Sequence, residues 1–243
     1  MTVLSTAHSG SERPFLKHGT VICVLLALGI IFVSPDPTRA NSAEQLSVKK
    51  LRKNQTFRID RTLTLNTNSK TIVVLLTHLE ETSDVIRAWN LERYRAQPLG
   101  DGLYQVDDKA GLSGQLDRRS LTDTSVTLIG TGAYTGQYVP IMISGNAMAS
   151  IQWKQRKKQS VKIEGVLFVQ LHNQILHWIG KALFPLIKDL AIGKTNRLVS
   201  VANKLVDRIH NRPGETLQRL QKKNDQIHPD FKTFLLNQNP PSQ

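Results

Sequence analysis

A basic run beside a tryptophan is the surface feature with the clearest chemistry. Trp153 is followed by Lys154, Arg156, Lys157 and Lys158, at the expected tip of a hairpin. Cations bind anionic lipid headgroups, and an indole ring lies readily at a membrane–water interface. The run therefore indicates a membrane or anion surface. The alternative, which we favour, is a solvated turn with Trp153 in the core.

An apolar helical stretch, 175–192, is the candidate wall of a ligand site. It carries Lys181, Lys188 and Asp189, so we do not expect it to span a membrane. Core packing against a sheet is the favoured role, and it is compatible with lining a cavity for a hydrophobic ligand. The side chains expected at such a cavity are Trp178, Leu183, Phe184 and Ile187.

Neither the glycines nor the histidines form a recognised motif. Gly130, Gly132 and Gly136 lack the spacing of a nucleotide-binding loop, which favours strand ends or a bulge. His172 and His177 are five residues apart, which is not the spacing that places two metal ligands on one helix face. We therefore expect no metal site and no cofactor.

Scattered acidic residues give no catalytic pair. Asp107, Asp108, Asp117 and Asp123 lie in or near expected turns, where solvated carboxylates are common. Their pairing cannot be inferred from spacing. We predict no catalytic residue.

Composition limits the classes of protein. The chain has 243 residues, 40% of them hydrophobic, and a net charge of +13, which favours one packed domain with extensions and an anionic partner. Its one cysteine, Cys23, excludes an intramolecular disulfide framework and a cysteine-built zinc site. Nucleic acid is not expected as a partner, because aromatic residues are only 6% of the chain and the N-terminus indicates export.

The N-terminus has the pattern of a targeting segment. Residues 20–34 are uncharged and follow Arg13 and Lys17, as in a signal peptide. Small residues at Thr38 and Ala40 favour cleavage of the Ala40–Asn41 bond. We expect an extracytoplasmic protein, periplasmic or secreted. The alternative is a retained anchor, residues 20–34, because the region before the apolar run is long.

The mature chain is expected to alternate strands and helices. Residues 41–55 are a basic linker, and Phe57–Leu65 has the alternation of a half-buried strand. Asn68 or Ser69 starts a helix. Turn-forming glycines then separate short apolar runs, as in an antiparallel meander. The expected strands are 103–106, 113–118, 125–130, 137–144, 149–154 and 161–169.

A long helix is expected to close the domain. Apolar residues recur every three or four positions from Leu171, Pro185 is expected to kink or divide the helix, and Gly193 to end it before a second helical stretch, 198–209. We place the domain at 56–212, followed by a polar C-terminal tail, 213–243. Phe231, Phe234, Leu235 and Leu236 can dock a short helix from that tail.

This element order resembles the START-like (SRPBCC) superfamily. The local likeness covers Phe57–Asn90, with a strand, a small polar turn and the stretch Leu75–Thr77 leading to Trp89. The resemblance implies a helix-grip fold, a curved antiparallel sheet wrapped on a long C-terminal helix, enclosing an apolar cavity for a lipid or other hydrophobic ligand. It supplies no catalytic motif, and Pro185 departs from an uninterrupted closing helix.

Three functions are carried forward. The leading hypothesis is an exported α+β protein that binds a hydrophobic or lipid-like ligand without catalysis. One alternative is a cyclase- or hydrolase-type enzyme on the same fold, and the other is a membrane-associated interaction protein with an anionic membrane surface as partner. The sequence does not determine the oligomeric state.

Overall fold

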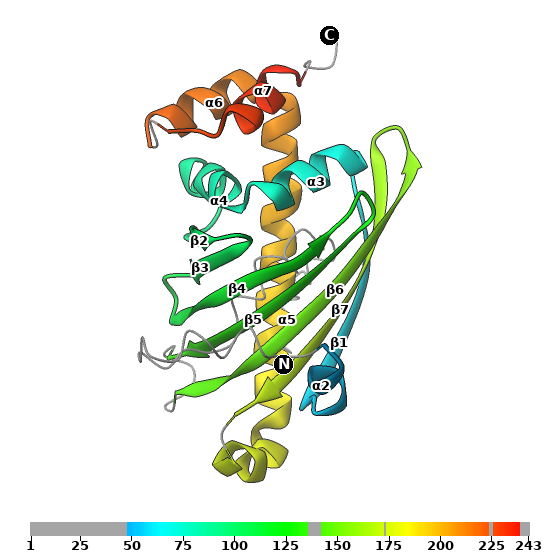
Figure 1. Cartoon of the computed structure of the whole chain (residues 1–243), viewed down its shortest axis with the longest axis vertical. Coiled ribbons are helices and arrows are strands. Elements are labelled where there is room, and N and C mark those ends of the chain that lie inside the picture. Colours follow the sequence, from blue (N-terminus) through cyan, green and yellow to red (C-terminus); the bar gives the residue numbers. More distant parts are fainter. Residues whose placement is uncertain (1–47, 136–141, 173, 224–225, 239–243) are drawn as a thin grey trace, which may run out of the picture.

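The structure is a computed structural model that describes residues 48–135, 142–172, 174–223 and 226–238. The described chain forms an antiparallel sheet with helices packed on both of its faces (Figure 1). Its elements in chain order are α2 (Val48–Lys53), β1 (Phe57–Leu65), α3 (Ser69–Thr77), α4 (Leu79–Ala88), β2 (Arg95–Gly100), β3 (Leu103–Asp107), β4 (Leu112–Leu121), β5 (Ser125–Tyr134), β6 (Ile143–Lys157), β7 (Ser160–Leu171), α5 (Gln174–Asn211), α6 (Pro213–Gln221) and α7 (Pro229–Leu236).

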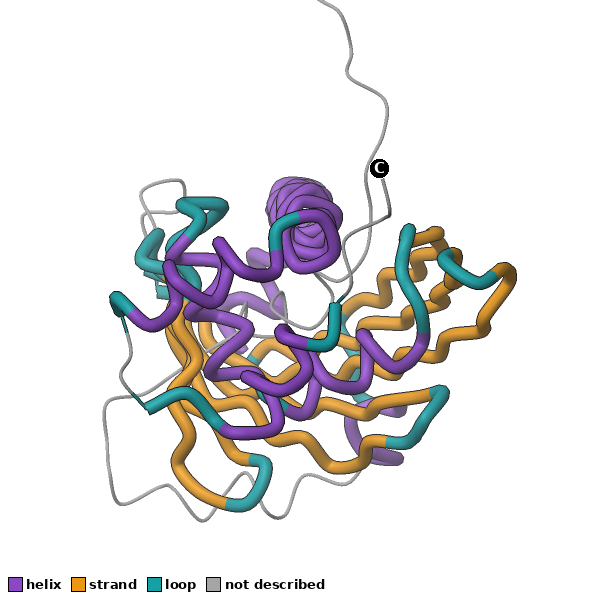
Figure 2. Tube along the Cα trace, turned by 90° about the horizontal axis from the view of Figure 1, so that it is seen from above, coloured by secondary structure: helices purple, strands orange, loops and turns teal. Residues whose placement is uncertain are grey.

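The seven strands are ordered β1-β7-β6-β5-β4-β3-β2, and every neighbouring pair is antiparallel. The first strand therefore pairs with the last, while the other strands form a meander. Seen from above in Figure 2, α3, α4 and the long α5 all lie on one side of the curved sheet. This is the helix-grip α+β fold that the sequence predicts.

The strand β1 has the predicted alternation. Phe57, Ile59, Leu63 and Leu65 are buried, while the residues between them are exposed or half-buried. Successive side chains of a strand point to opposite faces of the sheet, so this pattern fixes one face against the core. The helix α3 begins where predicted, because the side chain of Asn68 accepts a hydrogen bond from the backbone N–H of Thr71 at 2.9 Å.

A second, smaller cluster lies on the opposite face of the sheet. Ile129, Met148 and Phe168 pair across β5, β6 and β7, and Leu51 of α2 packs against them. The predicted linker therefore contains a helix from Val48 onward. Because Leu51 is 1% exposed, α2 is held on this face by burial of its apolar side chain.

The closing helix α5 differs from its prediction in one respect. It has 38 residues, about 57 Å of helix, and runs through both Pro185 and Gly193, so the predicted second helical stretch is part of it. Its C-terminal half is fixed in the core by side chains such as Val199, Leu205 and Ile209, each 0% exposed. Tertiary packing of one face stabilises a helix more than intrinsic propensity does, which accounts for its continuation past Gly193. Pro185 lies inside the same helix, so the predicted division at that residue is absent.

Two further predictions differ from the structure. Within the described residues, Ile143 and Ser144 belong to the same continuous strand as 149–154, rather than to a separate strand, while 136–141 lie outside the described residues. The short strand β2 was not predicted, because the sequence RAQPLG alternates only weakly and contains Pro98. It pairs with β3 at the edge of the sheet, the position at which a strand tolerates proline.

The packed core continues beyond the predicted boundary at residue 212. The helices α6 and α7 carry five buried apolar side chains into the main core: Leu217, Leu220, Phe231, Phe234 and Leu235. The short helix expected around Phe231 is present as α7. The predicted signal or anchor, residues 1–40, lies outside the described residues.

Candidate functional site

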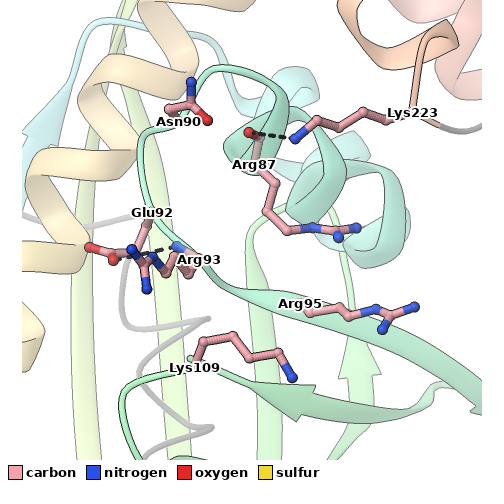
Figure 3. A pocket seen from close by; sticks show the side chains of 7 residues that line it. All are labelled: Arg87, Asn90, Glu92, Arg93, Arg95, Lys109 and Lys223. Atoms are coloured by element: carbon pink, nitrogen blue, oxygen red, sulfur yellow. Dashed lines mark hydrogen bonds between the residues drawn. The ribbon is translucent and has the colours of Figure 1, made fainter.

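A basic pocket lies at the edge of the molecule where α4, β2, the β3–β4 turn and the end of α6 meet (Figure 3). Its volume is about 310 Å³. Five of the seven lining residues are cationic, one is acidic and one is an amide. They are Arg87, Asn90, Glu92, Arg93, Arg95, Lys109 and Lys223.

The backbone beside the pocket is shaped by the end of α4. The N–H of Asn90 donates to the carbonyl of Arg87 at 3.1 Å, and the N–H of Leu91 donates to the carbonyl of Ile86 at 3.0 Å. This pair of bonds is a Schellman motif, which needs a left-handed residue after the helix. Asn90 supplies it with φ 51°, and the chain then turns directly into Arg93 and Arg95.

The opposite rim is the β3–β4 turn. The carboxylate of Asp107 accepts a hydrogen bond from the N–H of Lys109 at 2.6 Å, and Lys109 has φ 53°. Asp108, which lies between these two residues, is 3% exposed and accepts hydrogen bonds from the N–H groups of Ala110 and Leu112. Its carboxylate also pairs with Lys194 of α5, which anchors the turn to the long helix.

Among the described residues, Arg93, Arg95 and Lys223 form no ion pair with an acidic side chain, whereas Arg87 pairs with Asp84 and Lys109 pairs with Asp107. The one lining carboxylate, Glu92, is already bound by the guanidinium of Arg197, with Oε1 to Nη2 at 3.0 Å. Within the part of the chain that the structure describes, the guanidinium groups of Arg93 and Arg95 form no ion pair or hydrogen bond. Both residues are exposed on the pocket wall.

Two other cations present donors in the same place. Arg87 is bound through Nη2 to Asp84, but its Nε is buried and has no hydrogen-bond partner among the described residues. Lys223 reaches across from α6 and donates to the carbonyl of Arg87 at 3.0 Å, as Figure 3 shows.

This donor set is chemically suited to an anion rather than to a metal ion. Arginine presents its N–H groups in a fork that matches a carboxylate or phosphate, and lysine adds a point charge. A metal cation would be repelled by the surrounding charge. None of the lining residues is a serine, cysteine, histidine or tyrosine.

The predicted membrane or anion surface lies at another place in the molecule. Trp153 is 3% exposed, and its Nε1 donates to the carbonyl of Asp123 at 2.8 Å, so its indole is part of the core, as favoured from the sequence. Lys154, Arg156, Lys157 and Lys158 are exposed at the β6–β7 hairpin. The hairpin belongs to the opposite half of the sheet from β2 and β3, so these cations do not join the pocket.

The predicted ligand-lining residues belong to the N-terminal half of α5. The side chains of Trp178, Leu183, Phe184 and Ile187 lie outside the described part of the structure. That prediction stays a prediction.

The glycine prediction is corrected by the structure. Gly130 and Gly132 lie inside β5 rather than at a strand end or a bulge, and Gly132 pairs with Gly114 on one side and Gly145 on the other. A Cβ on Gly114 would lie 2.5 Å from the backbone oxygen of Thr131. Gly114 therefore serves the close approach of β4 and β5, while Gly136 lies outside the described residues.

Sequence reasoning missed the pocket because its residues are spread from position 87 to position 223 and only the fold joins them. One local signal was present. Arg93 and Arg95 alternate with Tyr94 and Ala96, which are buried, so both guanidinium groups lie on the solvent side.

Comparison with known proteins supports no function directly. The sequence matches no protein-family model and no curated protein. Among solved structures, the chain is similar to a conserved protein from Geobacillus kaustophilus, with TM-score 0.45 and 10% identity over 63% of this chain and 97% of that one. It is also similar to a START superfamily protein from Mycobacterium smegmatis, with TM-score 0.38 and 13% identity over 63% and 98%.

A third similar structure is norcoclaurine synthase from Thalictrum flavum, with TM-score 0.39 and 11% identity over 70% of this chain and 95% of that one. The described strand order and long closing helix define a helix-grip fold. Among the described residues, no helix combines the length and apolarity needed to cross a bilayer.

Proposed function

We propose that the protein is a non-catalytic binding protein whose ligand carries a carboxylate or phosphate group held in the basic pocket. The observation that carries the proposal is the set of five cations around one pocket, whose lining carboxylate is already bound to Arg197. Arg93 and Arg95 would bind the anion directly. Lys223 would add a point charge beside them.

The ligand is further proposed to be hydrophobic or lipid-like. The support is the fold itself, in which the sheet curves around α5, a helix with an apolar sequence over 175–192. An acidic amphiphile would place its charged group in the pocket and its chain against α5, with Trp178 and Phe184 as proposed contacts. Binding needs only complementary surfaces and no reacting group.

Binding of decanoate and decyl phosphate, with decanol as the neutral probe, tests this function by isothermal titration calorimetry. The double variant Arg93→Gln and Arg95→Gln is expected to bind the two acids with an affinity at least about tenfold lower, because two charge-assisted hydrogen bonds are lost. The matched control changes Arg156→Gln and Lys158→Gln, which removes the same charge from the β6–β7 hairpin. Equal weakening by both pairs, or acids that bind no better than decanol, contradicts the anion pocket.

Native mass spectrometry of gently purified protein tests the hydrophobic ligand separately. A co-purifying acidic lipid supports it. A ligand-free protein under several extraction conditions counts against it, even where the small acids bind.

The alternative functions make different predictions. A cyclase or hydrolase on this fold requires turnover of a bound ligand, which a ligand unchanged in both mass and chromatographic retention after incubation would exclude. A membrane-associated interaction protein requires retention of residues 1–19 and carbonate-resistant sedimentation with membranes. We propose export with cleavage at Ala40–Asn41, for which the N-terminal residue of the natural protein is the decisive measurement.

A further inference from the structure

A second cluster of donor groups lies where the C-terminal helices meet the α3–α4 junction. His78 follows the last residue of α3 and precedes α4, whereas His228 immediately precedes α7 and Asp230 lies in its first turn. The three residues bring one donor atom each to within 4.8 Å of the others. None of them lines the basic pocket, so the two sites are separate.

A buried carboxylate holds the two segments of this cluster together. Oε1 of Glu81 accepts a hydrogen bond from the backbone N–H of His228 at 3.2 Å, and its Oε2 lies 3.9 Å from Nδ1 of His78. Glu81 is 8% exposed. The ring centroids of His78 and His228 lie 4.6 Å apart, so the imidazoles are already adjacent.

A metal ion at His228 would use Nε2 of the ring or would displace the hydrogen bond that Nδ1 accepts. Nδ1 of His228 accepts the N–H of Asp230 at 3.3 Å, which is a long hydrogen bond, and Oδ2 of Asp230 lies 3.9 Å from the same nitrogen. Two imidazoles and one carboxylate form a donor set that suits zinc, which often keeps a water molecule in the fourth position. Arg118 donates to the carbonyls of Leu76 and Thr77 and is thereby held beside this junction.

Coordination of a metal ion would require the three side chains to move closer together. Tetrahedral bonds of about 2.0–2.1 Å place ligand atoms roughly 3.4 Å apart, which is somewhat closer than the separation here. The side chains of His228 and Asp230 are 50% and 83% exposed, so both can move without disturbing the core. His78 is the fixed member, because its ring packs against Phe231 with centroids 5.7 Å apart.

We propose that His78, His228 and Asp230 bind one Zn²⁺ ion, which clamps α7 to the α3–α4 junction. The proposal depends on these contacts and is independent of the anion pocket. The sequence did not show the site, because His78 and His228 are 150 positions apart and belong to no local motif. Coordination would connect two segments that otherwise share one backbone hydrogen bond through Glu81 and the ring contacts.

Calorimetric titration with Zn²⁺, on full-length protein purified without a histidine tag, tests the proposal. We expect one ion per chain and a rise in the temperature of unfolding. Co²⁺ in place of Zn²⁺ is expected to give the visible ligand-field absorption of a tetrahedral site. His228→Gln and Asp230→Asn change exposed side chains. Each substitution is expected to lower the affinity for Zn²⁺ at least tenfold and to remove most of the rise in unfolding temperature that Zn²⁺ causes.

The matched control is His210→Gln, which removes a histidine of α5 outside the cluster. Zn²⁺ affinity and the thermal shift are expected to be retained in this variant. Three results would overturn the proposal: no Zn²⁺ binding by the unaltered protein, full affinity in the double variant His228→Gln and Asp230→Asn, or an equal loss in the control. Full affinity in the double variant would mean that other histidines hold the ion.

Discussion

Lys194 and Lys162 both pair with an acidic side chain, but in different surroundings. Lys194 is 15% exposed at the side chain and Asp108 is 3% exposed, whereas Lys162 and Glu164 are 33% and 57% exposed. Removing one partner of a buried pair leaves an uncompensated charge, while an exposed pair contributes little. The free energy that each lysine contributes therefore depends on burial rather than on the pairing itself.

Lys194→Met is expected to lower the free energy of unfolding by about 3 kcal/mol, because the carboxylate of Asp108 loses its counter-charge inside the protein. Lys162→Met is expected to cost less than about 1 kcal/mol. Urea denaturation of both variants measures the difference. Equal costs for the two variants would mean that Asp108 is satisfied by its backbone N–H donors alone.

His210 should make the protein less stable in mild acid. Burial lowers the pKa of His210 below its ordinary 6.5, although the nearby Asp207 acts in the opposite direction. The hydroxyls of Thr67 and Thr71 lie 3.2 and 3.4 Å from its Nε2. Below pH 6.5 the unfolded chain takes up the proton first, so stability falls with falling pH until the folded-state pKa is passed.

The expected slope from this one group is at most about 1.4 kcal/mol per pH unit. His210→Gln should reduce the loss of stability between pH 7.5 and pH 5, as measured by urea denaturation at each pH. His78 and His172 also have lowered pKa values through burial, so some pH dependence remains in the variant. An unchanged pH dependence would contradict this role for His210.

The basic pocket shows what residue types alone cannot establish. In the sequence, the visible basic cluster is the four closely spaced cations after Trp153, which form an exposed hairpin end, whereas the pocket cations are dispersed along the chain. Cations that are close in sequence can be recognised from the sequence alone. The pocket cations come together only because the chain turns at Asn90 and because α6 packs near α4. The burial of Trp153, by contrast, followed from its place in an alternating strand.

At the scale of elements, two glycines should respond in opposite ways to the same substitution. A Cβ on Gly114 of β4 would lie 2.5 Å from the backbone oxygen of Thr131 and 2.9 Å from the Cα of Gly132, so β4 and β5 would have to separate. Gly114→Ala is expected to cost about 3 kcal/mol. A Cβ on Gly193 of α5 meets nothing within 4 Å, so Gly193→Ala is expected to add up to about 1 kcal/mol.

Thermal and urea unfolding of the two alanine variants measure this contrast. A Gly114→Ala variant as stable as the unaltered protein would mean that the strands move apart at no cost. A destabilised Gly193→Ala variant would mean that α5 needs flexibility at that position.

Strands were easier to predict than the course of the long helix. The alternation in β1 follows from local pattern, and the structure confirms it. The continuity of α5 through Pro185 and Gly193 depends on its docking in the core, which local pattern does not contain. The edge strand β2 was missed for the same reason, because its hydrogen bonds are made to β3 and its own sequence carries Pro98.

At the scale of the whole molecule, the C-terminal helices are part of the fold rather than an appendage. Phe231 and Leu220 are 0% exposed, and they join the same cluster as the sheet. Trp89 connects the two parts, since its Nε1 donates to Thr216 of α6 and its ring lies between Arg208 and Arg219. The average composition of residues 213–243 is polar, and it therefore predicted a tail. The few apolar residues of this segment are concentrated on the buried faces of two short helices, which an average does not reveal.

Truncation tests whether the chain can fold without these helices. Ending the chain after Asn211 removes five buried side chains, each worth about 1.5–3 kcal/mol, against a typical total stability of about 5–15 kcal/mol. We therefore expect no cooperative thermal unfolding, whereas ending it after Gln238 should leave the unfolding temperature unchanged. Phe231→Ala should cost about 3–5 kcal/mol, and Leu236→Ala, at a side chain 63% exposed, less than about 0.5 kcal/mol. Cooperative unfolding of the shorter chain would show that the sheet and α5 form a complete core by themselves.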